Sequence, residues 1–316
     1  MFFKNWFKRK RLPLMASKLN FSYGQNEVLR DVNLTIRNNQ IVAIVGKSGE
    51  GKSTFLNLIV GALTSSFKGN ISILGFSRAL SKEDIGYVPQ ELAIIPDLSI
   101  RKNIEFFGAI NGLTLNKALK AGKELMEILH LDVGLTRLPS ELSGGQKVRL
   151  NILVSFLHDP SILVLDEPFV GLDYSNRKLL WHFLQHQKNR HKTIIMTTHA
   201  LAEAEHHADM IVILHKRKIY AKGKVEEIKE KLKIRYVAEF KFHNLGKSKL
   251  EELKKYCTEH DITILDSFDN YLMFALTGEG QKNYLTKNFE KLKLEYEEIG
   301  FREPNLDELS LKVIQE

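Results

Sequence analysis

The chain has little cysteine and no long apolar run. Its 316 residues include one cysteine, Cys257, which excludes a disulfide within the chain and suits a reducing compartment. No stretch of about 18 or more apolar residues is present, and the first residues do not resemble a secretory signal. We therefore expect any role at a membrane to act through a partner protein.

The net positive charge is also small once the first residues are set aside. The net charge is +8, and residues 1–13 contribute +5 of it because they hold five basic residues and no acid. The remaining +3 is too small an excess for a surface that follows nucleic-acid phosphates, so we expect no nucleic-acid partner. Apolar residues make up 43% of the chain, enough for a packed core, and the length suggests a large domain with a smaller one.

Residues 1–15 form an aromatic and basic N-terminal segment that leaves two interpretations open. On a helix, its aromatic residues would share one side and its basic residues another, which is typical of a helix lying in a membrane interface. A frayed basic tail explains the same composition, because so short a helix nucleates poorly. The residues are Phe2, Phe3, Trp6 and Phe7 on the aromatic side and Lys4, Lys8 and Arg11 on the basic side.

A phosphate-binding loop pattern occupies residues 46–54: a glycine, four free positions, then Gly-Lys-Ser. Residues 41–45 read as a buried strand and residues 55–59 as a helix whose N-terminus would face the phosphates. Glycines let backbone N–H groups approach phosphate oxygens, Lys52 supplies a positive charge, and Ser53 offers a hydroxyl to Mg²⁺. The predicted nucleotide contacts in this phosphate loop are Gly46, Lys47, Ser48, Gly49, Gly51, Lys52, Ser53 and Thr54.

Acidic and histidine side chains follow two further predicted strands. Asp166 and Glu167 come after the apolar residues 162–165, and His199 comes soon after residues 193–196. The carboxyl ends of parallel strands meet at the ligand-binding edge of a sheet, so these side chains would lie beside the phosphate loop. There Asp166 suits Mg²⁺ coordination, Glu167 suits a base or orienter for the attacking water, and His199 could reach a γ-phosphate. Two acids after a strand are otherwise often a solvated turn, and the phosphate loop upstream favours the catalytic interpretation.

The histidines near residue 200 also allow a metal interpretation. Residues four apart share a helix face, and His199, Glu203 and His207 have that spacing, with His206 beside them. No open-site ligand set accompanies them, so we favour the phosphate role for His199.

Two further features have weak signals on their own. Residues 142–146, Leu-Ser-Gly-Gly-Gln, open a predicted helix, where a serine and two glycines can make a second anion site, although this composition is common in loops. Tyr23 precedes the phosphate loop next to Gly24; it could be a core residue or an aromatic plate for a purine ring.

The order of predicted elements gives the domain organisation. Helical periodicity runs from Ile100 to about Leu138, between two pieces of α/β core. We therefore expect an α/β domain over residues 16–229 with an inserted helical subdomain at about 91–150.

Residues 230–316 have a different pattern, with the predicted order β-α-β-β-α-β. This order indicates a small α+β, ferredoxin-like domain, closed by a short helix near residues 306–313. It contains no catalytic constellation, so a regulatory or dimer-contact role and a purely structural cap both stay open.

Taken together, these motifs resemble the nucleotide-binding subunits of ATP-binding cassette (ABC) transporters over about residues 16–225. Tyr174 stands where a proline is common, and Arg217 replaces a usual turn glycine; neither position carries the expected chemistry. The C-terminal extension is similar to the subgroup that powers drug and sodium exporters. The motifs that carry the resemblance are residues 46–54, Gln90, residues 142–146, residues 162–168, Asp173 and His199, and the subgroup is indicated by residues 86–90, 96–98 and 103–104.

The resemblance implies a P-loop ATPase cassette with ATP and Mg²⁺ as cofactors. It implies that Tyr23 stacks on adenine and that Lys52 and the loop amides hold the phosphates. The implied catalytic residues are Glu167, His199, Gln90 and Lys52, and the implied Mg²⁺ contacts are Ser53, Gln90 and Asp166. Ser143, Gly144, Gly145, Gln146 and Asp173 would serve the nucleotide of a second copy.

The function implied is ATP hydrolysis coupled to transport. A head-to-tail dimer, expected to be a homodimer, would close around two ATP and drive separate membrane permease subunits from the cytoplasmic face of the membrane. Export is the favoured direction, and import stays open. The alternative is a soluble cassette ATPase that acts on ribosomes or nucleic acid.

Overall fold

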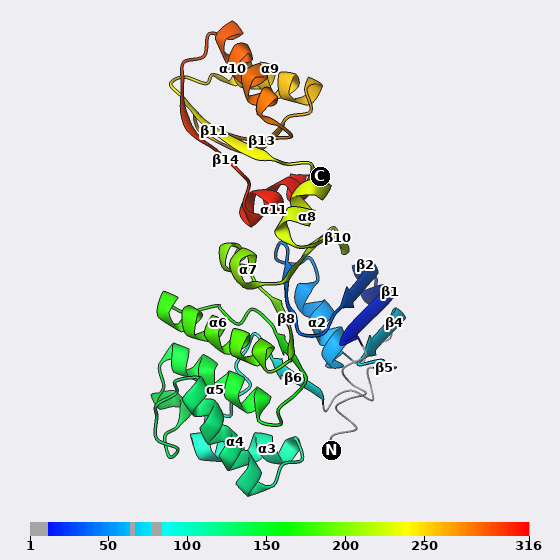
Figure 1. The fold of residues 1–316 in the computed structure, drawn as a ribbon, viewed down its shortest axis with the longest axis vertical. Coiled ribbons are helices and arrows are strands. Elements are labelled where there is room, and N and C mark those ends of the chain that lie inside the picture. Colours follow the sequence, from blue (N-terminus) through cyan, green and yellow to red (C-terminus); the bar gives the residue numbers. More distant parts are fainter. Residues whose placement is uncertain (1–11, 64–66, 78–83, 316) are drawn as a thin grey trace. The chain divides into compact units, whose positions relative to one another are not determined.

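The computed structural model describes residues 12–63, 67–77 and 84–315 (Figure 1). Most of the aromatic and basic N-terminal segment therefore lies outside the described residues. The chain divides into two compact units: the first holds residues 1–200 and 207–219, and the second holds residues 201–206 and 220–316.

A six-stranded sheet forms the centre of the first unit, and the end of its last strand in the chain, residues 220–223, belongs to the second unit. Its strands are β3 (Ile41–Val45), β6 (Ile85–Val88), β7 (Ile162–Leu165), β8 (Thr193–Thr197), β9 (Met210–His215) and β10 (Lys218–Gly223), in the order β10-β9-β3-β8-β7-β6. Neighbours from β9 to β6 run parallel, and β3, β7 and β8 are buried along their whole length, as strands covered on both faces must be. The expected α/β class is confirmed, and the carboxyl ends of β3, β7 and β8 meet at one edge.

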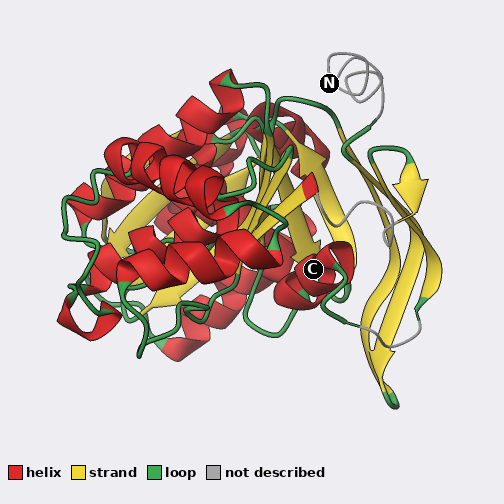
Figure 2. Cartoon of the chain, turned by 90° about the horizontal axis from the view of Figure 1, so that it is seen from below, coloured by secondary structure: helices red, strands yellow, loops and turns green. Residues whose placement is uncertain are grey.

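A second, antiparallel sheet completes this core. It contains β1 (Leu14–Tyr23), β2 (Asn26–Ile36), β4 (Lys68–Ile73) and β5 (Phe76–Ser77), in the order β2-β1-β4-β5. Its long strands are the yellow arrows at one side of the helices in Figure 2. Helix α2 (Lys52–Val60) packs against both sheets, because Phe55 of α2 shares one apolar cluster with Leu34 of β2 and Val42 of β3. This packing fixes α2, and with it the phosphate loop, at the edge of the parallel sheet.

The inserted helical region consists of α3 (Ile100–Ile110), α4 (Leu115–Ile128), a 3-10 turn (Pro139–Glu141) and α5 (Gly144–Phe156). Glycines let α3 and α4 approach closely: a Cβ on Gly108 would lie 2.4 Å from the Ala118 methyl, and one on Gly122 would lie 2.8 Å from Ile104. The three helices group together in Figure 1. Two further helices of the chain are α6 (Tyr174–Asn189) and α7 (Leu201–His207).

Helical structure ends earlier than the periodicity suggested. The expectation extended it to about Leu138, but α4 stops at Ile128. His130 adopts φ +48°, and the N–H of Leu131 donates to the carbonyl of Met126, which closes the helix end. The apolar residues that follow belong to a loop rather than to a helix.

The second unit contains the ferredoxin-like arrangement expected from the sequence. Strands β11 (Tyr236–Phe242), β12 (Thr263–Phe268), β13 (Tyr271–Leu276) and β14 (Tyr296–Arg302) form an antiparallel sheet in the order β12-β13-β11-β14, with α9 (Lys247–Glu259) and α10 (Glu279–Lys291) as its crossovers. Phe240 of β11 and Phe289 of α10 meet edge to face with ring centroids 5.1 Å apart, in a core of buried aromatic side chains. Helices α8 (Val225–Leu232) and α11 (Leu306–Gln315) complete the unit.

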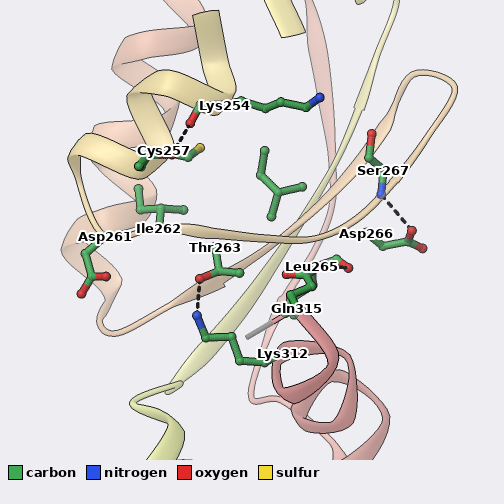
Figure 3. Close-up of a pocket in the computed structure, with 12 residues that line it drawn as sticks. Lys254, Cys257, Asp261, Ile262, Thr263, Leu265, Asp266, Ser267, Lys312 and Gln315 are labelled. Atoms are coloured by element: carbon green, nitrogen blue, oxygen red, sulfur yellow. Dashed lines mark hydrogen bonds between the residues drawn. The ribbon is translucent and has the colours of Figure 1, made fainter. Parts of the chain in front are cut away.

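Helix α11 covers the exposed edge of β12. Lys312 Nζ donates to Thr263 Oγ1 at 2.6 Å, and Gln315 Nε2 donates to the carbonyl of Leu265 at 2.8 Å (Figure 3). A bulge between Ile264 and Asp266 further interrupts this edge. Capping side chains and a bulge both prevent an edge strand from pairing with another chain.

Candidate functional site

The phosphate loop takes a shape that only glycine allows at two points. Gly46 has φ +155°, and a Cβ there would lie 2.4 Å from the carbonyl oxygen of Leu214. Gly51 has φ +95°, and a Cβ there would lie 3.0 Å from the carbonyl oxygen of Val28. Helix α2 begins at Lys52, so its first backbone N–H groups have no carbonyl one turn earlier and point into the loop. The loop is therefore an anion-binding nest at a helix N-terminus.

Lys52 holds the loop closed from inside. Its side chain is buried, and its Nζ donates to the carbonyl oxygens of Gly46 at 2.8 Å and Lys47 at 3.1 Å. Burial lowers the pKa of the Lys52 ammonium, and the carboxylates of Glu167 and Asp166 oppose that shift. A cation is thereby held over the loop before any phosphate binds.

Asp166 joins the loop to two strand ends. It is 3% exposed, and its Oδ1 accepts hydrogen bonds from Ser53 Oγ at 3.1 Å and from Thr197 Oγ1 at 2.6 Å. A carboxylate and a hydroxyl are the oxygen ligands that Mg²⁺ prefers. The structure therefore brings together two of the three residues expected to contact the metal, and their chemistry fits the ion.

Glu167 is buried beside the same residues, with one carboxylate oxygen facing the His199 ring. Its N–H donates to Thr197 Oγ1 at 2.9 Å, and its Oε2 accepts from the N–H of His199 at 3.2 Å. Its Oε1 lies 3.1 Å from His199 Nε2. Burial raises the pKa of the Glu167 carboxyl, while the charges of His199 and Lys52 oppose the shift. A buried carboxylate oxygen with a raised pKa is suited to accept a proton.

His199 lies between the acid and the loop. Its Nε2 is 3.1 Å from Glu167 Oε1 and 3.5 Å from Lys52 Nζ, and its side chain is 56% exposed. Its ring therefore reaches the space above the loop, where a terminal phosphate would lie.

Gln90 and Tyr23 are exposed and stand apart from this cluster. Gln90 is exposed and, within the described part of the chain, forms no hydrogen bond with Ser53 or Asp166. Tyr23 is 48% exposed and meets Phe21 edge to face, with ring centroids 4.8 Å apart, so its outer face is open.

Residues 142–146, which we call the signature turn, form a separate anion site. Ser143 caps α5: its Oγ accepts from the N–H of Gln146 at 3.3 Å, and Gln146 Oε1 accepts from the N–H of Ser143 at 2.9 Å. Ser143 and Gly144 are exposed. Among the described residues, no hydrogen bond or ion pair joins this turn to the phosphate loop. Asp173 caps α6 and is likewise exposed.

Sequence reasoning missed Thr197 and Glu50. The Thr197 hydroxyl bonds to both Asp166 and Glu167, but a threonine ending a buried strand carries no signal of that role. Glu50, at a free position of the loop pattern, places Oε1 3.1 Å from His215 Nδ1 and accepts from the N–H of Arg217 at 3.3 Å through Oε2. The sequence shows Glu50 as an unusual negative charge in a phosphate loop, but it does not predict that His215 and Arg217 are its partners.

A hollow of about 700 Å³ lies in the second unit, between α9, β12 and α11 (Figure 3). Lys254, Lys312, Asp261 and Asp266 line it together with apolar side chains, so its charges are balanced. None of the expected site residues lines this hollow. The phosphate chemistry belongs to the first unit.

The fold and these contacts define a phosphate-loop nucleotide-binding protein. A family model described as ABC transporter matches residues 29–170. The chain is 27% identical over 308 residues to the linearmycin resistance ATP-binding protein LnrL of Bacillus subtilis, covering 95% of this chain and 97% of that protein. It is 32% identical to the Nod factor export ATP-binding protein I of Rhizobium etli, covering 68% of this chain and 69% of that protein. It is 35% identical to the sulfate/thiosulfate import ATP-binding protein CysA of Synechococcus elongatus, covering 70% of this chain and 65% of that protein.

A solved ATP-binding subunit of an ABC transporter aligns with a TM-score of 0.63 at 29% identity, covering 69% of this chain and 92% of that one. The chain belongs to the ABC transporter family and is an ATP-binding subunit that couples ATP hydrolysis to transport. The resemblance found in the sequence is thereby confirmed. No helix among the described residues has the length and apolar character needed to cross a bilayer.

Proposed function

We propose that this subunit powers export, with two copies closing around two ATP molecules and driving separate permease subunits. One observation supports it above all: Lys52, Ser53, Asp166, Glu167 and His199 meet within hydrogen-bonding distance at the carboxyl ends of β3, β7 and β8. The phosphate loop and the ends of two strands far apart in sequence supply these groups, which is an arrangement suited to phosphoryl transfer to water.

Each residue then has one task in hydrolysis. The loop amides and Lys52 bind the phosphates, and Ser53 and Asp166, with Gln90, would hold Mg²⁺, which neutralises developing charge on the phosphate oxygens. Glu167 orients the attacking water and accepts its proton at Oε1, and His199 contacts the γ-phosphate from the exposed side. Burial of Glu167 against Thr197 fixes the base in place.

The separation of the two anion sites supports the proposed dimer. The signature turn is exposed and has no bonded link to the phosphate loop within the described residues, so in a single chain it serves no nucleotide. In a head-to-tail dimer, each nucleotide would lie between the phosphate loop of one copy and the signature turn and Asp173 of the other.

The inserted helices supply a surface for a membrane partner. Large apolar side chains are exposed there: Phe106 is 44% exposed, Ile110 64% and Leu115 52%, and Leu92, at 43%, follows closely after Gln90. Large apolar side chains exposed on one group of helices are typical of a protein contact. A partner bound there would receive motion from Gln90 and hold the subunit at the cytoplasmic face of the membrane.

The direction of transport is proposed from the relatives. The linearmycin resistance protein matches nearly the whole chain, including the second unit, and a Nod factor export protein matches the cassette. The import protein is similar over 70% of this chain. The relative that matches through the second unit is named for resistance to linearmycin, and we favour export because removal of a compound is one way to resist it.

The test is to capture the partners from the protein's own cells. Tagged Glu167→Gln protein would be purified with ATP present after mild detergent extraction of membranes, with Lys52→Ala as the matched control that cannot hold ATP. We expect a protein with several membrane spans in stoichiometric amount. Ribosomal proteins or nucleic acid without a membrane partner would contradict the transporter subunit assembly and favour a soluble cassette.

A further inference from the structure

Helices α5 and α6 begin side by side, and Asn176 fills the contact between them. A Cβ placed on Gly145 of the signature turn would lie 2.7 Å from Asn176 Nδ2, 2.8 Å from its Cγ and 2.9 Å from its Oδ1. All three atoms of the carboxamide therefore lie against the bare Cα of Gly145. No other residue type at 145 leaves room for this contact, since any side chain would displace the amide.

The backbone and the side chain of Asn176 also hold the start of α6. The N–H of Asn176 donates to Asp173 Oδ1 at 2.8 Å, and its Nδ2 donates to Asp173 Oδ2 at 2.9 Å. Both carboxylate oxygens of Asp173 are thus bound by one residue. The backbone N–H of Asn176 holds the pKa of Asp173 below its usual range, so the carboxylate stays charged and bound.

Each side of this contact is itself rigid. The reciprocal bonds of Ser143 and Gln146 fix the signature turn. Arg149 donates to the carbonyl oxygen of Gly145 at 3.3 Å and to that of His130 at 2.7 Å, which ties the turn to the inserted helices. A shift of either helix start therefore reaches the other through the Asn176 side chain.

We propose that Asn176 is a positioning residue that makes the signature turn and Asp173 act as one surface toward the nucleotide of a second copy. This inference rests on the proposed sandwich dimer. Asn176 itself acts through Gly145 and Asp173. With the amide in place, the two motifs meet the second copy in a fixed relation, and without it each must be ordered separately when the dimer closes.

The test measures ATP-driven dimerisation in the Glu167→Gln background. Asn176→Ala should raise the ATP concentration needed for half-maximal dimer, followed by light scattering, about 10-fold, because it removes a hydrogen bond to a charged group. Binding of a fluorescent ATP analogue by dilute monomer should not change. Asn176→Asp separates two explanations, because it fills the same space but repels the Asp173 carboxylate. If the hydrogen bond to Asp173 matters, this variant should need as much ATP to dimerise as Asn176→Ala does. If Asn176 only fills space, it should need no more ATP than the parent.

Two controls keep the result interpretable. Ser175→Ala, an exposed neighbour in the same turn, should dimerise like the parent. Gly145→Ala approaches the contact from the other side and should also raise the required ATP concentration. If the parent dimerises and Asn176→Ala does so at the same ATP concentration, the positioning role is overturned and the proposed function stands. If the parent itself does not dimerise, the proposed function fails and the positioning role fails with it.

Discussion

The chain carries two anion sites of opposite construction. At the phosphate loop, buried side chains from α2 and from the ends of β7 and β8 bond to one another, as Asp166 does with Ser53 and Thr197. At the signature turn, the polar groups are exposed and satisfied locally, as in the capping pair of Ser143 and Gln146. The first site is organised for chemistry within one chain. The second offers a surface to another molecule.

This difference suggests that the two sites act in different steps: the first in hydrolysis and the second in assembly of the dimer. Polar groups buried in a bonded network are held in place for the reaction, because moving them would leave charges unpaired. An exposed helix N-terminus can instead bind an anion that another molecule brings to it. Changes at the first site should thus alter the chemical step, and changes at the second should alter assembly.

The largest effect is expected from Glu167→Gln. Loss of the proton acceptor should slow phosphate release by about 100-fold or more, while ATP binding is kept because Lys52 and the loop are untouched. Single-turnover hydrolysis measured beside ATP-analogue binding checks both. Glu124→Gln, at an exposed glutamate of α4, should hydrolyse normally. Undiminished release by Glu167→Gln would reject Glu167 as the base.

A smaller loss is expected from Ser143→Ala. Removing the hydroxyl should lower steady-state hydrolysis about 10- to 100-fold through lost contact with the second copy's nucleotide, and leave ATP binding to the monomer unchanged. Ser99→Ala is the matched control, because Ser99 caps α3 in the same way by accepting from the N–H of Lys102 at 3.3 Å. Both changes should cost about 1 kcal/mol of stability, but only the first should affect hydrolysis. Equal hydrolysis rates in Ser143→Ala and Ser99→Ala would contradict a contact between Ser143 and the nucleotide.

A moderate effect on thermal stability is expected because the Glu167 carboxyl is buried. The pKa of Glu167 is raised in the folded state above the ordinary value of 4.5, so its contribution to stability is full below that value and is lost as pH rises through the folded pKa. Glu167→Gln has no such loss and should therefore melt higher than the natural protein at pH 8, by about 2–4 °C for each kcal/mol. The gap should close toward pH 4. A gap independent of pH would mean that burial of the charge is not its cause.

The smallest effect is expected at the exposed aromatic ring. Tyr23→Ala should raise the KM for ATP about 2- to 10-fold, the size of one stacking contact, and leave kcat unchanged. Tyr23→Phe keeps the ring and should behave like the natural protein. A fall in kcat with unchanged KM would contradict a role for Tyr23 in holding the adenine ring of ATP.

The sequence predicts the first site better than the second. Ser53, Asp166, Glu167 and His199 were expected together because the carboxyl ends of parallel strands share one edge, and the structure brings them together. Thr197 escaped prediction, because threonine is ordinary at the end of a strand. Its role exists only once β7 and β8 are neighbours.

Other features depend on contacts that no local pattern encodes. Asn176 and Gly145 are 31 positions apart, and their contact arises from how α5 and α6 cross. The end of α4 depends on the backbone of His130 adopting the left-handed conformation, which a histidine in the sequence does not predict. In contrast, the alternation within each strand was enough to predict the strands of the second unit, which are connected by two crossover helices and by the short turn between β12 and β13.

The most direct measurement mixes two inactive variants. Lys52→Ala destroys the phosphate loop, and Ser143→Glu places a negative charge where the signature turn would meet phosphates. If each ATP lies between the phosphate loop of one copy and the signature turn of the other, every mixed dimer keeps one intact site. Random mixing should then restore roughly a quarter of natural ATPase activity, while each variant alone stays inactive. An inactive mixture, with mixed dimers shown by co-purification of two different tags, would contradict the account.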